Sequence, residues 1–496
     1  MDLCHMEANE NPAFEEILKH ILHVDALIFN SMDVCEDSLG QTLFNLFLSV
    51  PPEADNICPF CGRKCPGYDA PKRNNQKWLK SWRSLDWGNA MVVLKAQTHR
   101  ISCPEHGVVV ASVPWAYHDS GFTKEFDKQA TWKAQNMSKS AVSKEMRISW
   151  QTVGKSITRV RNAEEPDITG RYEGLQKLGI DEVSYQTGHS YLTILVNHDK
   201  SEVIDVAVGH SQEVLDSMLD KIPENIRNGI THVTADGAKW IRASVDKYCP
   251  NATFCIDSFH VVEWINESLS EVRLSEWRKA LGKVQNLKEE RKDMKKDLKK
   301  ARKNGDTEDI QYLKDGIHEL NQEIKEKEKE AEKIKGSLYA LGKNPDNLTE
   351  SQLVRLNWLM VLSNALHRAY DRKEQIRMIL KMKDPEEAAK ELKKWIRWTS
   401  VSRLEPFKKL GEKIKRHFDD IINTITHGLS NALIESTNNT IRQIINRAYG
   451  FRNVKNLMNM VLLSCTSRFK SLPNRGITSY GVSNWRSQTL INPEVA

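Results

Sequence analysis

Three acidic residues, Asp181, Asp236 and Glu435, occupy positions in the sequence that suggest catalysis. Asp181 and Asp236 each follow an apolar run of β-forming residues, and Glu435 falls in a later helical segment. Carboxylates that cluster repel one another and are tolerated when cations neutralise them. Mg²⁺, or Mn²⁺ in its place, prefers a few carboxylates together with phosphate and water. Two such ions roughly 4 Å apart activate an attacking oxygen and steady a leaving oxygen. The three acids therefore suggest phosphoryl transfer with two divalent ions per active site.

The order of strands indicates which aspartate is the partner of Asp181, because a strand-end aspartate taken alone is usually a turn or helix cap. Residues 175–257 read as three strands, a helix, a fourth strand ending at Asp236, a second helix and a fifth strand ending at Asp257. This βββαβαβ order is that of an RNase H-like sheet, in which the first and fourth strands are neighbours. The order favours Asp236 over Asp257. A third carboxylate must then come from a later helix, where Glu435 fits.

The spacing of four residues predicts a structural zinc site. A CxxC pair is followed, 41 residues later, by a CxxH pair, and thiolate and imidazole ligands suit one tetrahedral Zn²⁺. Cys65 and His99 are competing ligands, and reduced cysteines in a β-rich subdomain are the alternative to a metal site. A catalytic zinc is not expected, because no acidic general base accompanies the ligands. The four predicted ligands are Cys58, Cys61, Cys103 and His106.

Residues 138–146 and 150–160 predict two short helices joined by a turn, the length pattern of a helix-turn-helix whose second helix enters the major groove. Residues 139–161 hold six Lys or Arg and one Glu. The alternatives are a plain helical pair in a core and, for the later arginines, a basic helix face without a special role. The candidate DNA contacts are Lys144, Arg147, Gln151, Thr152, Lys155, Ser156 and Arg159, joined by Arg442, Arg447 and Arg452 beside the last acid.

The length of 496 residues predicts about three domains, and we expect a multidomain α+β protein. Residues 12–48 read as helices, and a charged coiled-coil hairpin is expected over 284–336, as a solvated appendage or as a surface for dimerisation or DNA contact. The expected divisions are an N-terminal helical segment (1–55), a zinc-binding ribbon (56–115), a helix-turn-helix domain (116–165), the first part of an RNase H-like α/β catalytic core (166–268), a long helical insertion (269–420), the last part of the core with Glu435 (421–470) and a tail (471–496).

Composition indicates the cellular compartment in which we expect the protein. The net charge is +6, and nine mostly scattered cysteines argue against a disulfide framework. No apolar run approaches the roughly 18 residues of a membrane span, and the N-terminal residues lack the features of a signal peptide. We therefore expect a soluble, intracellular protein with no membrane partner.

Four motifs resemble one known family. "GIDE" at 179–182, "ADG" at 235–237, "DSFHVV" at 257–262 and "SNALIESTNNTIRQIINRAYGFRN" at 430–453 are similar to the ISL-three family of bacterial insertion-sequence transposases. The resemblance implies a DDE transposase with Asp181, Asp236 and Glu435 as its metal-binding triad, and with Asp257 and His260 as an auxiliary motif near the active site. It also implies a helical domain inserted before the last acid. The chain departs from the family pattern in the zinc region, where CxxH replaces the common CxxC.

The function expected from these features is a DNA transposase that binds the terminal inverted repeats of its element, cuts the 3′ ends and joins them to target DNA. Its partner would be double-stranded DNA, held by a homodimer, in the bacterial cytoplasm and associated with the nucleoid. Two rival functions are a catalytically silent DNA-binding regulator and an RNase H-like nuclease that cuts without joining. Intact acids at all three positions weigh against the first rival, and the upstream DNA-binding modules weigh against the second.

Overall fold

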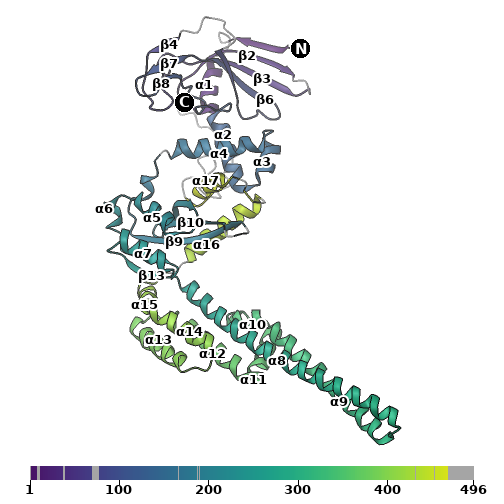
Figure 1. Cartoon of the computed structure of the whole chain (residues 1–496). Helices are drawn as coiled ribbons and strands as arrows, with labels where there is room; N and C mark the ends of the chain where they lie inside the picture. The colour runs from purple at the N-terminus through teal and green to yellow at the C-terminus, as the bar shows by residue number, and fades with distance from the viewer. Residues whose placement is uncertain are drawn as a thin grey trace, which may run out of the picture.

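The computed structural model describes residues 2–7, 12–36, 40–69, 78–165, 167–186, 188, 190–429, 432–448, 450–451 and 453–466. Figure 1 shows an elongated molecule in which an N-terminal β region, a group of short helices, a central mixed sheet and a long helical region follow one another. Within the described part of the chain, no helix combines the length and the hydropathy that a membrane span requires.

The N-terminal region is built on a five-stranded sheet of order β1-β2-β3-β6-β5, with one helix, α1, against it. The expectation of helices throughout residues 12–48 is wrong, because α1 is the only helix among the described residues of that range. β3 lies between β2 and β6, so both of its edges are hydrogen-bonded, and its apolar residues do not alternate strictly with polar ones, a pattern that also fits a helix. The sheet also crosses the expected boundary at residue 55. Its elements are β1 (Asp2–Glu7), α1 (Pro12–Leu22), β2 (Ile28–Glu36), β3 (Thr42–Ser49), β5 (Leu79–Arg83) and β6 (Met91–Gln97).

A small three-stranded sheet of order β4-β7-β8 lies beside the larger one. Its strands are β4 (Gly67–Asp69), β7 (Arg100–Cys103) and β8 (Gly107–Val110). The β7–β8 hairpin carries the CxxH pair in its turn, and an isolated bridge between Ile57 and Lys64 closes the loop that carries the CxxC pair.

Three short helices follow: α2 (Lys124–Asn136), α3 (Lys139–Glu145) and α4 (Trp150–Glu164). Ser138 and Ser149 cap the N-termini of α3 and α4 by accepting backbone N–H bonds, which explains where both helices begin. The predicted helix-turn-helix is therefore present as α3 and α4. It does not stand alone, because Phe126, Val142 and Ile157 share one hydrophobic cluster with the central sheet.

The central sheet has the order β11-β10-β9-β12-β13. β9, β10 and β11 form an antiparallel meander, and β12 and β13 run parallel to β9. The prediction that the first and fourth strands are neighbours is confirmed by the pairing of β9 with β12. The elements are β9 (Lys177–Gln186), β10 (Ser190–Asn197), β11 (Glu202–Val208), α5 (Gln212–Asp220), α6 (Glu224–Arg227), β12 (His232–Ala235), α7 (Lys239–Tyr248) and β13 (Thr253–Ile256).

A helical region is inserted after β13, and the chain then returns to the sheet through two last helices. The predicted hairpin is confirmed as α8 and α9, and α8 starts well before it, directly after β13. The inserted helices are α8 (Ser258–Asn304), α9 (Thr307–Lys335), α10 (Leu338–Gly342), α11 (Glu350–Leu362), α12 (Asn364–Ile379), α13 (Pro385–Ser400), α14 (Glu405–Arg416) and α15 (Phe418–His427), and the returning ones are α16 (Ala432–Arg447) and α17 (Val454–Ser464).

Candidate active site and DNA-binding face

The parallel pairing of β9 and β12 places Asp181 and Asp236 at matching positions. Thr234 lies opposite Gly179, and each aspartate follows two residues later. Asp236 follows the last residue of β12, as predicted. Asp181 does not end its strand, because β10 continues to pair with β9 as far as Gln186. The pairing of β9 with β12 stops at Gly179, so the sheet opens on that side next to Asp181.

Asp181 is the acid most strongly tied to its surroundings. Its Oδ2 accepts a hydrogen bond of 2.6 Å from Nδ2 of Asn438, and its Oδ1 accepts one of 2.7 Å from the backbone N–H of Glu182. Burial raises the pKa of Asp181; the bond from Asn438 and the nearby His260 oppose the rise, and Asp257 adds to it. A carboxylate held in this way is costly to charge without a cation close by.

The contact with Asn438 brings α16 to β9 across 257 positions of sequence. The two elements approach closely at Gly179, where a Cβ atom would lie 2.5 Å from Cδ1 of Ile434. Only glycine allows this approach, which explains the first letter of the "GIDE" motif. Glu435 is exposed and lies one helical turn before Asn438, on the flank of α16 next to the side that touches Asp181.

Glu182, which the sequence analysis did not single out, also belongs to this edge. Burial raises the pKa of Glu182 to about 7, and repulsion from Asp236 and then Asp181 adds to the rise. Its position directly after Asp181, a predicted catalytic acid, could have marked it in the sequence as a residue of the site. Asn438 could have been marked in the same way, because it lies three residues after Glu435.

Asp257 and His260 lie at the start of α8, next to the same edge. Asp257 is buried and caps α8 by accepting from the N–H of Phe259 at 2.9 Å. His260 places Nε2 3.9 Å from Oδ2 of Asp257 and Nδ1 3.2 Å from Oε2 of Glu263. Asp257 thus has a structural task as a helix cap, which is consistent with an auxiliary position.

One buried oxygen atom that lacks a hydrogen-bond partner in the described part of the chain indicates that these residues suit a divalent cation. Oδ1 of Asn438 is buried without a hydrogen-bond partner among the described residues, although its Nδ2 is bound to Asp181. An amide oxygen of this kind is a ligand that hard cations and their water molecules accept. Asp181, Asp236 and Glu435 do not form a set whose ligand oxygens all lie within 4.8 Å of one another in the described structure. A two-ion site does not require such a set, because each ion need be shared by only some of the acids.

The predicted zinc ligands do gather in one place. Ligand atoms of Cys58, Cys61, Cys103 and His106 all lie within 4.8 Å of one another, the only such group among the described residues. Sγ of Cys61 is 3.7 Å from Sγ of Cys103, and Nδ1 of His106 is 3.6 Å from Sγ of Cys103 and 3.8 Å from Sγ of Cys58. Ligands about 2.3 Å from a tetrahedral Zn²⁺ would lie about 3.8 Å apart. The cluster can therefore hold zinc.

Electrostatics and the competing residues support this ligand set. Burial raises the pKa of the Cys103 thiol, but hydrogen bonds from His106 and Glu105 outweigh it and lower the pKa to about 6. The competing ligand His99 is bound at 3.1 Å to Oδ1 of Asn56. The Cys65 thiol points to the carbonyl of Arg63 at 3.5 Å but also borders the cluster, where burial and then the neighbouring Cys103 raise its pKa.

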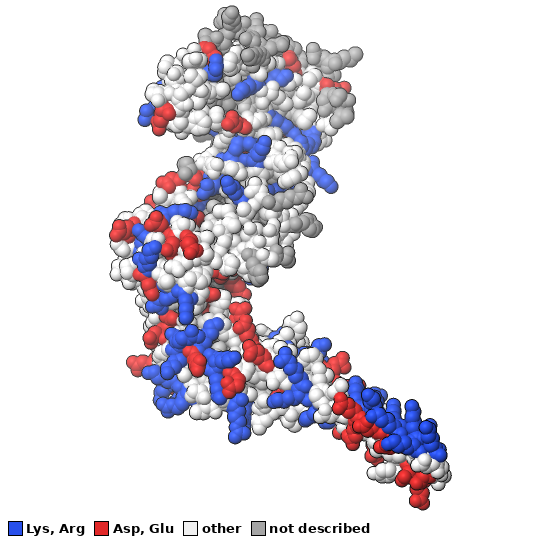
Figure 2. Space-filling view, viewed as in Figure 1, with Lys and Arg blue, Asp and Glu red and all other residues white. Residues whose placement is uncertain are grey.

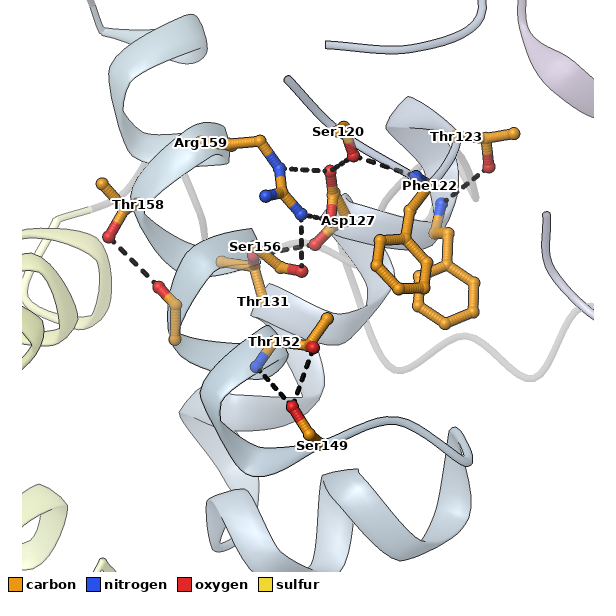
Figure 3. Close-up of polar contacts among 12 residues, drawn as sticks. Ser120, Phe122, Thr123, Asp127, Thr131, Ser149, Thr152, Ser156, Thr158 and Arg159 are labelled. Atoms are coloured by element: carbon orange, nitrogen blue, oxygen red, sulfur yellow. Dashed lines mark hydrogen bonds and ion pairs between the residues drawn. The ribbon is translucent and has the colours of Figure 1, made fainter. Parts of the chain in front are cut away.

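Some of the predicted DNA contacts are exposed to solvent, whereas others are already bonded within the protein. Arg159 forms two hydrogen bonds, of 2.9 and 2.8 Å, with the fully buried carboxylate of Asp127, and Ser156 is also fully buried (Figure 3). Arg147 binds Asp86 and Gln41 of the N-terminal region. The side chains of these three residues are therefore engaged within the protein and are not free to contact DNA. Lys144, Gln151 and Lys155 are exposed.

Thr152 and the later arginines have partners of a different kind. Thr152 bonds with the capping hydroxyl of Ser149 at 2.9 Å (Figure 3). Arg442 is exposed and reaches Oδ1 of Asn439 at 3.1 Å, and Arg447 donates to the carbonyl of Gln135. Arg452 lies outside the described residues.

A groove of about 1120 Å³ runs along the exposed side of α4. One wall carries Gln151 and Lys155, and the other carries Gly450 and Asn453 between α16 and α17. The candidate recognition helix and the chain that follows the last acid therefore line the same hollow. A helix-turn-helix fixed to a mixed sheet with acids along one edge is the architecture of a protein that binds and processes DNA.

Comparison with known proteins agrees with this class. Residues 178–461 match a family described as "Transposase", and residues 111–160 match the helix-turn-helix domain of transposase family ISL3. The transposase for insertion sequence element IS1557 of Mycobacterium tuberculosis (strain CDC 1551) is 38% identical over 462 residues, covering 92% of this chain and 97% of that protein. The transposase for insertion sequence element IS1001 of Bordetella parapertussis is 22% identical over 420 residues, covering 84% and 89%. The chain belongs to the ISL3 family of transposases, and the predicted resemblance is confirmed.

Proposed function

We propose that this transposase binds the terminal inverted repeats of its own insertion sequence, cuts their 3′ ends and joins them to target DNA in an RNase H-like core. Asp181, Asp236 and Glu435 would hold two Mg²⁺ or Mn²⁺ ions. When bound, such ions make an oxygen nucleophilic and neutralise a leaving oxygen. The observation that carries the proposal is the bond between Asp181 and Asn438, which holds the helix of Glu435 against β9.

The chain's own residues would prepare the reaction in distinct ways. Asn438 orients the Asp181 carboxylate and favours its charged form. Asp236, bonded through Oδ1 to the N–H of Ala238, is fixed at the start of α7. Lys155 and Gln151 would contact the element end in the groove along α4, and a structural zinc would hold the knuckles of the N-terminal region together.

Assembly and domain division complete the proposal. Two ends must be held together for coordinated cutting, and a symmetric homodimer is the simplest arrangement. We place the protein in the cytoplasm on nucleoid DNA. We retain the proposed domain order, but treat residues 1–115 as one N-terminal unit, because its main sheet combines strands from both sides of residue 55.

A strand-transfer assay with labelled element ends tests the chemistry. Asp181→Asn, Asp236→Asn and Glu435→Gln should each lower cleavage by on the order of 10³-fold if the ions contribute about 4 kcal/mol, and end binding should persist. Full activity of Asp236→Asn together with loss in Asp257→Asn would move the catalytic role to Asp257. Binding by the wild type without cleavage would identify a silent regulator, and cleavage without joining would identify a nuclease.

A further inference from the structure

A strongly basic surface on the inserted helices has no part in the function described so far. Between Lys390 and Arg416 the chain has ten basic and three acidic residues, a net charge of +7. Two of the acids pair with neighbours on their own helices, Glu391 with Lys394 at 2.6 Å and Glu405 with Lys408 at 2.7 Å. Figure 2 shows blue side chains gathered over α13 and α14. The remaining basic residues, which we call the α13–α14 basic face, are Lys390, Lys393, Arg397, Arg403, Lys409, Lys413, Lys415 and Arg416.

The packing of the two helices turns this charge outward. Trp395 of α13 and Phe407 and Ile414 of α14 are buried in the core of the insertion, so the lysines and arginines occupy the opposite sides. None of the eight residues of the basic face forms an ion pair within 4.0 Å with an acid that the structure describes. A concentration of unpaired positive charge of this kind fits a polyanion.

The basic tip of the α8–α9 hairpin provides a useful contrast. Several of its lysines are neutralised: Lys288 pairs with Glu328 of α9 at 2.6 Å, Lys296 with Asp293 at 2.8 Å and Lys300 with Asp297 at 2.9 Å. Its charge therefore serves in part to hold the hairpin and its own helix together. The α13–α14 basic face has no ion pair of this kind among the described residues, although Lys393 and Lys413 lie over aromatic rings of Phe418 and Trp264.

The basic face is connected to the catalytic edge. Nζ of Lys413 lies 3.6 Å from the ring centroid of Trp264, and Asp236 is among the charges that act on this lysine. The same indole packs against Gly237, where a Cβ atom would lie only 2.9 Å from it. The basic face thus begins beside the loop that carries Asp236.

The insertion is also fixed relative to the sheet. Nδ2 of Asn423 and the hydroxyl of Thr424, both on α15, donate to carbonyls of β13 at 3.1 and 2.6 Å. Figure 1 shows α13 and α14 on one side of the central sheet and the helix-turn-helix on the other. DNA that is held by α4 and crosses the catalytic edge would reach the basic face beyond the point of cleavage.

We propose that the α13–α14 basic face binds the phosphates of duplex DNA on the far side of the scissile bond, without reading its sequence. This DNA is either the flank of the element before cleavage or the target at joining, and both present the same phosphate backbone. The inference rests on the proposed function for the direction in which DNA crosses the site. Binding of duplex phosphates by the basic face is testable without it.

The test compares the full-length wild type with two triple variants matched in charge. Lys409→Ala, Lys415→Ala and Arg416→Ala remove charge from the basic face, and Lys295→Ala, Lys299→Ala and Arg302→Ala remove the same charge from the hairpin tip. All six side chains are exposed, so both variants should unfold at the wild-type temperature. The probes are a pre-cleaved element end, the same end continued by flanking DNA, and an unrelated duplex supplied alone or together with the pre-cleaved end. Affinity is measured over a range of salt concentrations.

If the flank is the ligand, the wild type should bind the flanked end more tightly than the pre-cleaved end, and only the basic-face variant should lose that gain. If the target is the ligand, only the basic-face variant should lose capture of the second duplex. Its salt slope for the unrelated duplex should fall by up to roughly 2.7, at about 0.9 per phosphate contact. If the basic-face variant loses the extra affinity for the flanked end, the ligand is the flank. If it instead loses binding of the unrelated duplex in the presence of the pre-cleaved end, the ligand is the target. Unchanged slopes, or an equal loss in the hairpin variant, would overturn the inference. If no form bound the element end, the proposed function would fail, while the unrelated duplex would still decide the role of the basic face.

Discussion

Asn438 illustrates how much of the proposed active site depends on an uncharged residue. Its Nδ2 donates a hydrogen bond of 2.6 Å to Oδ2 of Asp181, and its Oδ1 has no hydrogen-bond partner among the described residues. A hydrogen bond to a charged group contributes about 1.5–3 kcal/mol, enough to alter the affinity of a carboxylate for a cation. The residue therefore links the position of α16 to the electrostatics of β9.

We predict that Asn438→Ala needs about tenfold more Mg²⁺ for the same thermal stabilisation, since about 1.4 kcal/mol of metal binding corresponds to a factor of ten. The measurement is the melting temperature over a Mg²⁺ titration, which does not depend on activity. Asn439→Ala is the matched control, because Asn439 is exposed and its side chain accepts a hydrogen bond from Arg442 and, among the described residues, has none with the predicted acids. Equal Mg²⁺ midpoints for the wild type and Asn438→Ala would contradict the role of this amide.

Arg159 and Lys155 lie one turn apart on α4 and should behave differently on mutation. Arg159→Ala leaves the buried carboxylate of Asp127 with only Ser120 as a side-chain partner. We expect a loss of about 3 kcal/mol in the free energy of unfolding, because breaking a buried pair strands a charge. Lys155→Ala should leave stability unchanged and lower the salt slope of element-end binding by roughly 0.9. Denaturant unfolding and gel-shift titrations separate the two. Wild-type stability in Arg159→Ala would restore it as a candidate DNA contact.

At the scale of elements, the cluster of Cys58, Cys61, Cys103 and His106 joins two loops that have little core of their own. The cluster around Ile101 consists largely of the cysteines themselves. A bound ion would therefore supply much of the folding free energy of this small sheet.

We predict one Zn²⁺ per chain in the purified full-length protein, measured by elemental analysis. Cys58→Ser and His106→Ala should lower the zinc content and the temperature of the first unfolding transition. His99→Ala should retain the ion, because that imidazole is bound to Asn56 outside the cluster. Zinc loss in His99→Ala but not in His106→Ala would exchange their assignments.

At the scale of the whole molecule, the helix-turn-helix and the central sheet share one hydrophobic cluster and are therefore packed as one unit. The outer part of the α8–α9 hairpin instead extends away from the other elements (Figure 1). This outer part is a candidate for contact with a second copy of the chain. The base of the hairpin is not, because Ile334 belongs to the core of the insertion.

We predict that replacing residues 286–330 with a short Gly/Ser linker leaves binding of single ends intact and sharply reduces paired-end complexes. This deletion preserves Ala331 and Ile334, whose side chains are buried. Mass photometry of the one-end and two-end species provides the measurement. An unchanged yield of two-end complexes would show that the hairpin is a solvated appendage.

Local patterns in the sequence were sufficient for several conclusions. The strand order from 175 to 257, the two helices from 138 to 160, the hairpin and the clustering of the four candidate zinc ligands all follow from periodicity, capping residues and ligand spacing. The family also followed, because its motifs are contiguous stretches such as residues 430–453. Each of these signals lies within a short segment, so no long-range contact was needed to read it.

Only the tertiary structure shows which residues are buried and which residues distant in sequence are in contact. The run in β3 fits helix or strand until its neighbours β2 and β6 are known. Arg159 looks like a DNA contact until Asp127, on another helix, is seen to bind it. Asp181 and Asn438 are 257 positions apart, and nothing local to either one reveals their contact. The energy of a side chain is set by the atoms packed around it, and those atoms come from whichever segments the fold brings together.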